Sequence, residues 1–270
     1  MATSKTEMRL AVVADLHCSK ASQGSWHALF QQISEAADVL ALCGDLTNFG
    51  LPEEAHVLVK ELSVLKIPII AVLGNHDYES GQQVEIHHIL SAAGIQLLDG
   101  EAHEIQGVGF AGAKGFGGGF GQRVLAPWGE ETVKRFVREA LDETLKLESA
   151  LARLRTDKRI VLLHYAPIQE TVEGEPLEIY PFLGCSRLEE PLNRFPVTAI
   201  FHGHAHHGSY QGRTKTNIPV YNVAHQVLRA TFPDRPLFHL ERISLEPMAG
   251  TTPGQNGQQS ISQSTQRAQS

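Results

Sequence analysis

Phe201-His202-Gly203-His204-Ala205-His206-His207 places four histidines within seven residues. Neutral imidazole is the commonest protein ligand for transition metals, and core packing alone does not account for such crowding. The stretch ends a short apolar run, residues 197–201, that is typical of a buried strand. It therefore predicts a metal site at the end of a strand, with a His-rich surface loop as the alternative.

Four other short apolar runs also end in side chains that can bind a metal. The runs span residues 10–14, 39–43, 67–73 and 159–163, and the side chains that follow them are Asp15 and His17, Asp45, Asn75 and His76, and His164. Ligands of α/β proteins bind beyond the carboxyl ends of parallel strands, so the recurrence counts for more than any single motif. Taken alone, each group also fits a helix cap or a polar turn.

The donor types and their number narrow the kind of metal site. A mixed set of oxygen and nitrogen donors suits Mn, Fe, Zn or Co better than Ca or Mg, which favour oxygen ligands. The candidates outnumber the ligands of one tetrahedral ion, and this favours a site with two metal ions.

Composition and charge exclude several function classes. The 270 residues carry a net charge of -7, which does not favour a general nucleic-acid-binding surface, because such surfaces are basic. The polar residues 1–8 lack the apolar core of a signal peptide, and no run has the length of a membrane span. Three cysteines do not indicate a disulfide framework. We therefore expect a cytoplasmic protein without a membrane partner.

The remaining pattern predicts one domain, residues 1–247, followed by a disordered Gln/Ser-rich tail, residues 248–270. Helical periodicity is present at residues 26–37, 51–65, 85–93 and 130–154. Strands of a second sheet are expected at residues 95–98, 102–113, 220–223 and 237–245.

The glycines after residue 106 need a separate interpretation. Residues 107–112 fit the dinucleotide pattern G-x-G-x-x-G, but a glycine-rich loop at 115–121 follows instead of a helix, which argues against that function. We expect residues 115–121 to form a mobile lid or a flexible surface loop.

The ordered series Asp15-x-His17, Gly44-Asp45, Gly74-Asn75-His76-Asp77, His164 and Gly203-His204-Ala205-His206 resembles the calcineurin-like metallophosphoesterases. The blocks follow the family's order and span residues 10 to about 207. The resemblance implies an α/β fold, a four-layer αββα sandwich of two mixed β-sheets flanked by helices. It also implies hydrolysis of a phosphodiester or phosphomonoester in a small-molecule phosphate ester or nucleotide.

The resemblance further implies roles for individual residues. Two divalent transition-metal ions, Mn, Fe or Zn, would be held by Asp15, His17 and His206 for one ion, Asn75, His164 and His204 for the other, and Asp45 for both. A hydroxide bridging the ions would attack phosphorus in line. His76 would stabilise the developing charge or protonate the leaving oxygen.

The four clustered histidines would then differ in role. Strand-like alternation would put His202, His204 and His206 on one side and His207 on the other. The resemblance selects His204 and His206 as ligands. It leaves His202 as a core or supporting residue and His207 as a loop residue.

One block departs from the protein-phosphatase branch of the family. Asn48 and Phe49 occupy positions where that branch has an acid and an arginine. This difference favours a phosphodiesterase-type or broad-specificity enzyme, with Asp77 as a possible substitute partner for His76 or a cap of its turn. The alternatives are a metallo-β-lactamase-type zinc hydrolase, whose motif lacks its acid here, and a non-catalytic metal-binding scaffold. The sequence leaves the oligomeric state open.

Overall fold

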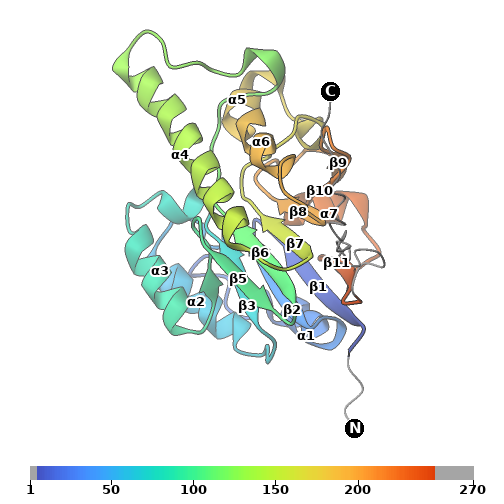
Figure 1. Cartoon of the computed structure of the whole chain (residues 1–270). Helices are drawn as coiled ribbons and strands as arrows, with labels where there is room; N and C mark the ends of the chain where they lie inside the picture. The colour runs from blue at the N-terminus through green and yellow to red at the C-terminus, as the bar shows by residue number, and fades with distance from the viewer. Residues whose placement is uncertain (1–4, 247–270) are drawn as a thin grey trace, which may run out of the picture.

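Two mixed β-sheets pack face to face in the computed structural model, which describes residues 5–246 (Figure 1). The first sheet has the strand order β11-β1-β2-β3-β4, in which β1 to β4 are parallel and β11 is antiparallel to β1. Its strands are β1 (Glu7–Val13), β2 (Val39–Cys43), β3 (Ile69–Val72), β4 (Gln96–Leu97) and β11 (His239–Ser244). All five residues of β2 are buried, as expected where both faces of a parallel sheet are covered.

The second sheet has the order β5-β6-β7-β8-β10-β9, with a parallel centre and antiparallel strands at both edges. Its strands are β5 (Ala102–Ile105), β6 (Val108–Gly112), β7 (Lys158–Leu162), β8 (Ala199–His202), β9 (Gln211–Arg213) and β10 (Pro219–Asn222). Gln106 and Gly107 join β5 to β6 as a hairpin, and both have positive φ. A hairpin at this place agrees with the rejection of the dinucleotide motif.

Helices cover the outer face of each sheet (Figure 1). The first sheet carries α1 (His27–Ala36), α2 (Pro52–Leu62) and α3 (Gln83–Ala92), whereas α4 (Glu131–Arg153) lies on the second. The predicted four-layer αββα sandwich is therefore confirmed. Shorter helices are α5 (Tyr180–Leu183), α6 (Glu189–Leu192) and α7 (His225–Thr231). Within residues 5–246, no helix combines the length and the apolar character needed to cross a membrane.

Two strands lie in a different sheet from the one predicted. The segments around β4 and β11 pair with β3 and β1 of the first sheet, and not with the second sheet. Both are edge strands, whose own apolar patterns do not specify a neighbour. Their place depends on tertiary packing, as when Ile243 of β11 becomes buried in the core of the first sheet.

The glycine loop after β6 is packed and is not a surface loop. Gly115 and residues 117–119 are buried. Gly118 donates to the carbonyl of Pro181 at 2.6 Å, and Gly119 donates to that of Gly184 at 2.9 Å. The missing side chains let this backbone approach α5 closely, so the expectation of a surface loop was wrong. The proposed tail, residues 248–270, lies outside the described residues.

Candidate metal centre

The carboxyl ends of β1, β2, β3, β7 and β8 converge at one edge of the sandwich, as the sequence predicts. Backbone hydrogen bonds continue the parallel pairing beyond β1 and β2, from Asp15 to Gly44 at 3.0 Å and from His17 to Asp45 at 2.9 Å. This extended pairing holds the polar side chains of neighbouring strand ends side by side.

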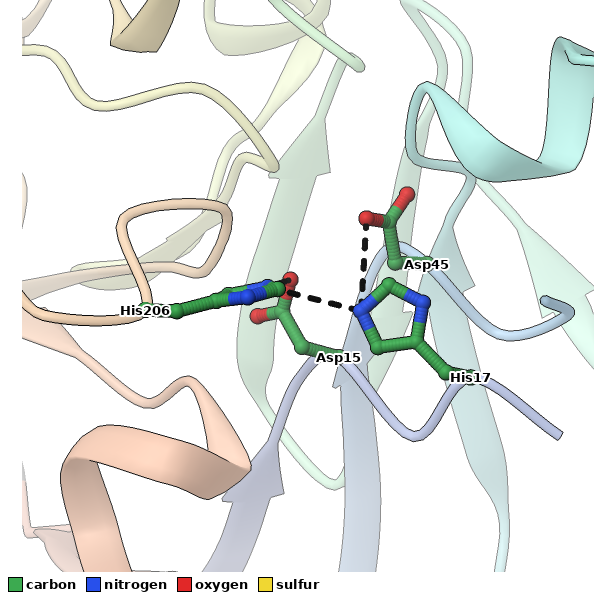
Figure 2. Close-up of side chains that lie close together, drawn as sticks. All are labelled: Asp15, His17, Asp45 and His206. Carbon is green, nitrogen blue, oxygen red and sulfur yellow. Dashed lines mark hydrogen bonds and ion pairs between the residues drawn. The ribbon is translucent and has the colours of Figure 1, made fainter. Parts of the chain in front are cut away.

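The first group of converging side chains contains Asp15, His17, Asp45 and His206, whose nearest ligand atoms all lie within 4.8 Å of one another. His206 Nε2 is 3.0 Å from Asp15 Oδ1 and 3.4 Å from His17 Nε2. His17 Nε2 is 3.8 Å from Asp45 Oδ2 (Figure 2). Both carboxylates are buried. The group therefore has the spacing of a possible cation site.

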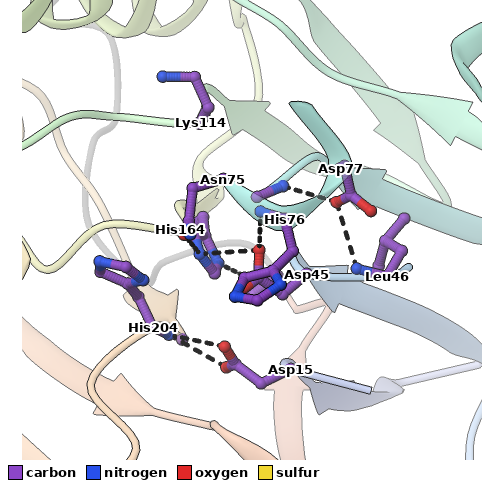
Figure 3. Close-up of polar contacts among 12 residues, drawn as sticks. Asp15, Asp45, Leu46, Asn75, His76, Asp77, Lys114, His164 and His204 are labelled. Carbon is purple, nitrogen blue, oxygen red and sulfur yellow. Dashed lines mark hydrogen bonds and ion pairs between the residues drawn. The ribbon is translucent and has the colours of Figure 1, made fainter. Parts of the chain in front are cut away.

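The second group contains Asp45, His164 and His204, again with ligand atoms within 4.8 Å of one another. His164 Nε2 lies 3.3 Å from Asp45 Oδ1 and 2.8 Å from Asn75 Oδ1 (Figure 3). The rings of His164 and His204 are 4.9 Å apart. Asp45 belongs to both groups, and Asn75 adds an oxygen to the second.

Backbone carbonyls orient the two histidines of the second group. His164 Nδ1 donates to the carbonyl of Cys43 at 3.0 Å, and His204 Nε2 donates to that of Phe182 at 3.1 Å. In a neutral ring these bonds leave His164 Nε2 and His204 Nδ1 as the atoms with a free lone pair. Fixing of the ring by a second hydrogen bond is usual for metal-binding histidines.

The backbone is strained where these side chains leave it. Among residues 5–246, six non-glycine residues have positive φ, and four of them are Asp15 (59°), His17 (45°), Asp45 (48°) and His204 (71°). Such conformations cost about 1–3 kcal/mol each and gather at functional sites. The strain therefore marks this edge as the functional one.

Two glycines make the close approach of the strand ends possible. Gly44 has a φ of 84°, and a Cβ there would overlap the ring of His164. A Cβ at Gly203 would overlap the carboxylate of Asp15. No other residue type fits these places without moving a candidate ligand.

The two neighbouring imidazoles have opposite pKa shifts. Burial alone would lower the pKa of His164, but the Asp45 carboxylate outweighs it and raises that pKa to about 9. Burial lowers the pKa of His204 to about 4. Burial also opposes ionisation of Asp45, yet the nearby imidazoles, His164 foremost, hold its pKa below its usual range.

The donor set fits a divalent cation. Asp45 Oδ2 is buried without a hydrogen-bond partner. His164 Nε2 faces two oxygens, although its only proton in the neutral ring is on Nδ1. In the part of the chain that the structure describes, the Asp15 and Asp45 carboxylates pair with histidines and with no lysine or arginine. Carboxylate oxygens and imidazole nitrogens that converge in this way are donors that a divalent transition-metal ion accepts.

A family model described as calcineurin-like phosphoesterase matches residues 8–208. The chain belongs to this family. The matched residues contain every candidate ligand from Asp15 to His206, and they confirm the resemblance seen in the sequence. Membership also argues against the metallo-β-lactamase alternative.

Solved structures share the fold of this calcineurin-like phosphoesterase. Phosphopantetheinyl hydrolase (PptH) from Mycobacterium tuberculosis has 12% identity and a TM-score of 0.63, over 92% of this chain and 99% of that one. GAP50, the anchor in the inner membrane complex of Plasmodium, has 14% identity and a TM-score of 0.53, over 83% and 73%. TT1561 of Thermus thermophilus has 14% identity and a TM-score of 0.51, over 89% and 100%. No curated protein sequence matches the chain.

His76 of this phosphoesterase lies in the short 3₁₀ turn His76–Tyr78, next to Asn75. Its backbone N–H donates to Asp45 Oδ1 at 2.9 Å, and its Nδ1 donates to the backbone carbonyl of Asn48 at 2.7 Å. Glu79 Oε2 lies 3.5 Å from the same Nδ1. Glu79 was missed in the sequence, although the spacing of three residues within a turn is a signal that could have found it.

Asp77 does not pair with His76. Its buried carboxylate accepts hydrogen bonds from the backbone N–H groups of Gly74, Leu46 and Thr47 and from the Thr47 hydroxyl, at 2.6 to 3.2 Å (Figure 3). Asp77 therefore closes the turn, the second of the two roles considered from the sequence.

The other clustered histidines are not part of the two groups. His202 is buried, its Nδ1 donates to the Gly203 carbonyl at 2.8 Å, and its Nε2 lies 2.7 Å from the Thr171 hydroxyl. The expected strand-like alternation is wrong, because β8 ends at His202 and His204 takes a left-handed conformation. His207 is exposed, as a loop residue should be.

Proposed function

We propose that the chain is a hydrolase with two divalent transition-metal ions, Mn, Fe or Zn, that cleaves a phosphodiester or phosphomonoester of a small molecule or nucleotide. The observation that carries the proposal is the membership of Asp45 in both groups of converging donors. One ion would be held by Asp15, His17 and His206, the other by Asn75, His164 and His204, and both by Asp45.

The chain's own residues would divide the chemistry as follows. Divalent ions supply a water of lowered pKa and positive charge for the phosphate oxygens. The Asn48 carbonyl orients His76, whose Nε2 has no hydrogen-bond partner among the described residues. A protonated Nε2 can donate to the leaving oxygen.

The surroundings of the centre favour a diester over a monoester. Phe49 and Phe182 are 53% and 58% exposed. Phe49 follows Asn48, whose carbonyl holds His76, and the carbonyl of Phe182 itself holds His204. Over residues 5–246, no lysine or arginine side chain forms a hydrogen bond or ion pair with a candidate ligand. Phe49 stands where the protein-phosphatase branch of the family has an arginine, so that cationic clamp for a dianionic monoester would be missing, whereas a monoanionic diester with an organic group does not need one.

A substrate panel with defined metals tests the proposal. The 270-residue protein is stripped with a chelator, reloaded with Mn, Zn, Fe or Mg, and assayed on bis-4-nitrophenyl phosphate and 4-nitrophenyl phosphate. A phosphopantetheinyl ester is added, because the similar structure from Mycobacterium tuberculosis is named for that substrate. We expect no turnover in stripped protein, and turnover of the diester with Mn, Zn or Fe. A protein that binds metal but hydrolyses no ester would instead be the non-catalytic scaffold.

Replacing Asp45 by Ala tests the shared carboxylate. We expect Asp45→Ala to lose both bound metal and activity, because the side chain belongs to both groups. Elemental analysis and diester hydrolysis are measured on the same preparation. The control is Asp142→Ala, which removes an exposed acid from α4. Unchanged metal content in Asp45→Ala would contradict the two-metal proposal.

A further inference from the structure

A row of four aromatic rings leads away from His204 of the second donor group. The ring of Tyr165 lies 4.4 Å from that of His204, measured between ring centres. Phe116 follows at 5.7 Å from Tyr165, and Phe136 of α4 at 4.8 Å from Phe116. Phe182 of α5 ends the row, 6.0 Å from Phe136. Tilted and edge-to-face rings at these separations stabilise one another beyond the area that they bury, so each ring supports the next.

The four rings differ in how far they reach the solvent. Tyr165 is buried, Phe116 and Phe136 are half-buried, and Phe182 is exposed. The Lys114 ammonium lies 5.4 Å from the ring centre of Tyr165 and 4.9 Å from that of Phe116, so it covers part of these two rings. The ring of the row that is most open to a ligand is therefore that of Phe182, and the inner three support it.

Hydrogen bonds hold the backbone of Phe182 and of both its neighbours. The carbonyl of Phe182 accepts a hydrogen bond from His204 Nε2 at 3.1 Å. The carbonyl of Pro181 accepts one from a glycine N–H of the loop after β6 at 2.6 Å, and that of Leu183 accepts one from the Ala166 N–H at 3.0 Å. An aromatic side chain on a backbone fixed in this way loses little conformational entropy when it binds a ligand.

Phe182 adjoins the second donor group, whereas His76 adjoins the first. The ring of His76 lies 4.5 Å from that of His17, and Phe182 is bonded to His204 through its carbonyl. A diester carries two organic groups on phosphorus, and only one of them leaves. With the leaving oxygen at His76, the group that stays on phosphorus would lie toward the second donor group and the exposed ring of Phe182.

We propose that Phe182 is a specificity-determining residue, whose ring contacts a flat aromatic group on the side of the phosphodiester that does not leave. The inference rests on the proposed diester hydrolysis and names its class of substrate, a diester with an aromatic ring on the retained alcohol. Such a ring buries apolar area against Phe182 and also gains a ring–ring contact. A saturated ring of the same size buries similar area without that contact.

Two diesters with the same leaving group test the proposal on the metal-loaded protein. They are phenyl 4-nitrophenyl phosphate and cyclohexyl 4-nitrophenyl phosphate, and release of 4-nitrophenolate gives kcat and KM for each. Comparing the phenyl-to-cyclohexyl ratio of kcat/KM between wild type and variant cancels the difference in intrinsic reactivity. We expect Phe182→Leu to lower this ratio by about two- to tenfold, the usual value of one ring–ring contact, and chiefly by raising KM for the phenyl diester.

Two further variants complete the design. Phe182→Tyr keeps the ring and should keep the wild-type ratio. Leu145→Ala removes an exposed apolar side chain of α4 that is not part of the row, and it should change neither diester. Metal content, measured by elemental analysis, should be equal in all variants. An unchanged ratio in Phe182→Leu, with both diesters hydrolysed, would overturn this inference alone. Wild-type protein that hydrolyses neither diester would overturn the proposed hydrolysis and this inference with it.

Discussion

At the residue scale, His164 and His204 show what a sequence pattern does and does not contain. His164 was predicted as a candidate ligand from the strand end that it follows, whereas the family resemblance selected His204 from the four clustered histidines. The carbonyls that select their free nitrogen atoms belong to Cys43 and Phe182, which lie 121 and 22 residues away in the chain. Such partners depend on how distant loops pack, so no local pattern indicates them.

His76 gives the sharpest test at this scale. A hydrogen bond to the Asn48 carbonyl positions its ring, and this hydrogen bond does not depend on a bound metal. We expect His76→Ala to lower kcat for the diester by about 10²–10⁴-fold, the usual contribution of a general acid. Metal content measured by elemental analysis should stay the same. Loss of metal together with activity would make His76 a ligand instead.

At the element scale, the candidate centre depends on the turns that follow five strands. Their positions were predicted well, because a short buried strand that ends in a polar residue is a clear pattern. The partner sheets of β4 and β11 were not, because short edge strands carry no pattern of their own for choosing a neighbour. The turn after β2 further requires Gly44, whose close approach to His164 is visible only in three dimensions.

A matched pair of glycine substitutions separates two effects of an added Cβ atom: the clash with neighbouring side chains and the strain of a positive φ. Gly44 and Gly81 have similar φ values, 84° and 75°, but only Gly44 has neighbours where a Cβ would stand. We expect Gly44→Ala to lower the free energy of unfolding by about 1–3 kcal/mol more than Gly81→Ala, and to weaken metal binding. Urea unfolding and metal titration check both variants. Equal effects would mean that His164 moves aside freely.

At the scale of the whole molecule, the two sheets meet at the end of β1. Ala14 accepts a hydrogen bond from His225 and donates one to Val223, and both partners follow β10 of the second sheet. The four-layer fold was predicted through the family resemblance. This connection was not, because α7 and its buried His225 had no signal in the sequence.

His225 makes stability depend on pH. Burial lowers its pKa to about 4, from an ordinary value of 6.5, so the unfolded chain binds a proton more readily than the folded one. Its contribution is present above pH 6.5 and is lost as the pH falls toward 4, by up to about 3 kcal/mol at about 1.4 kcal/mol per pKa unit. The free energy of unfolding is measured with urea, in the presence of a chelator that removes bound metal. For His225→Gln it should decrease less over this pH range than for the wild type. Parallel pH profiles would contradict this assignment.

The two groups that share Asp45 draw their members from both sheets: Asp15, His17, Asp45 and Asn75 follow strands of the first, and His164, His204 and His206 follow strands of the second. Ions bound there would link the two sheets of the sandwich. At a free concentration of a hundred times its Kd, each would add about 2.7 kcal/mol to folding. The free metal concentration would then set the resistance of the chain to proteolysis, in addition to its catalytic activity.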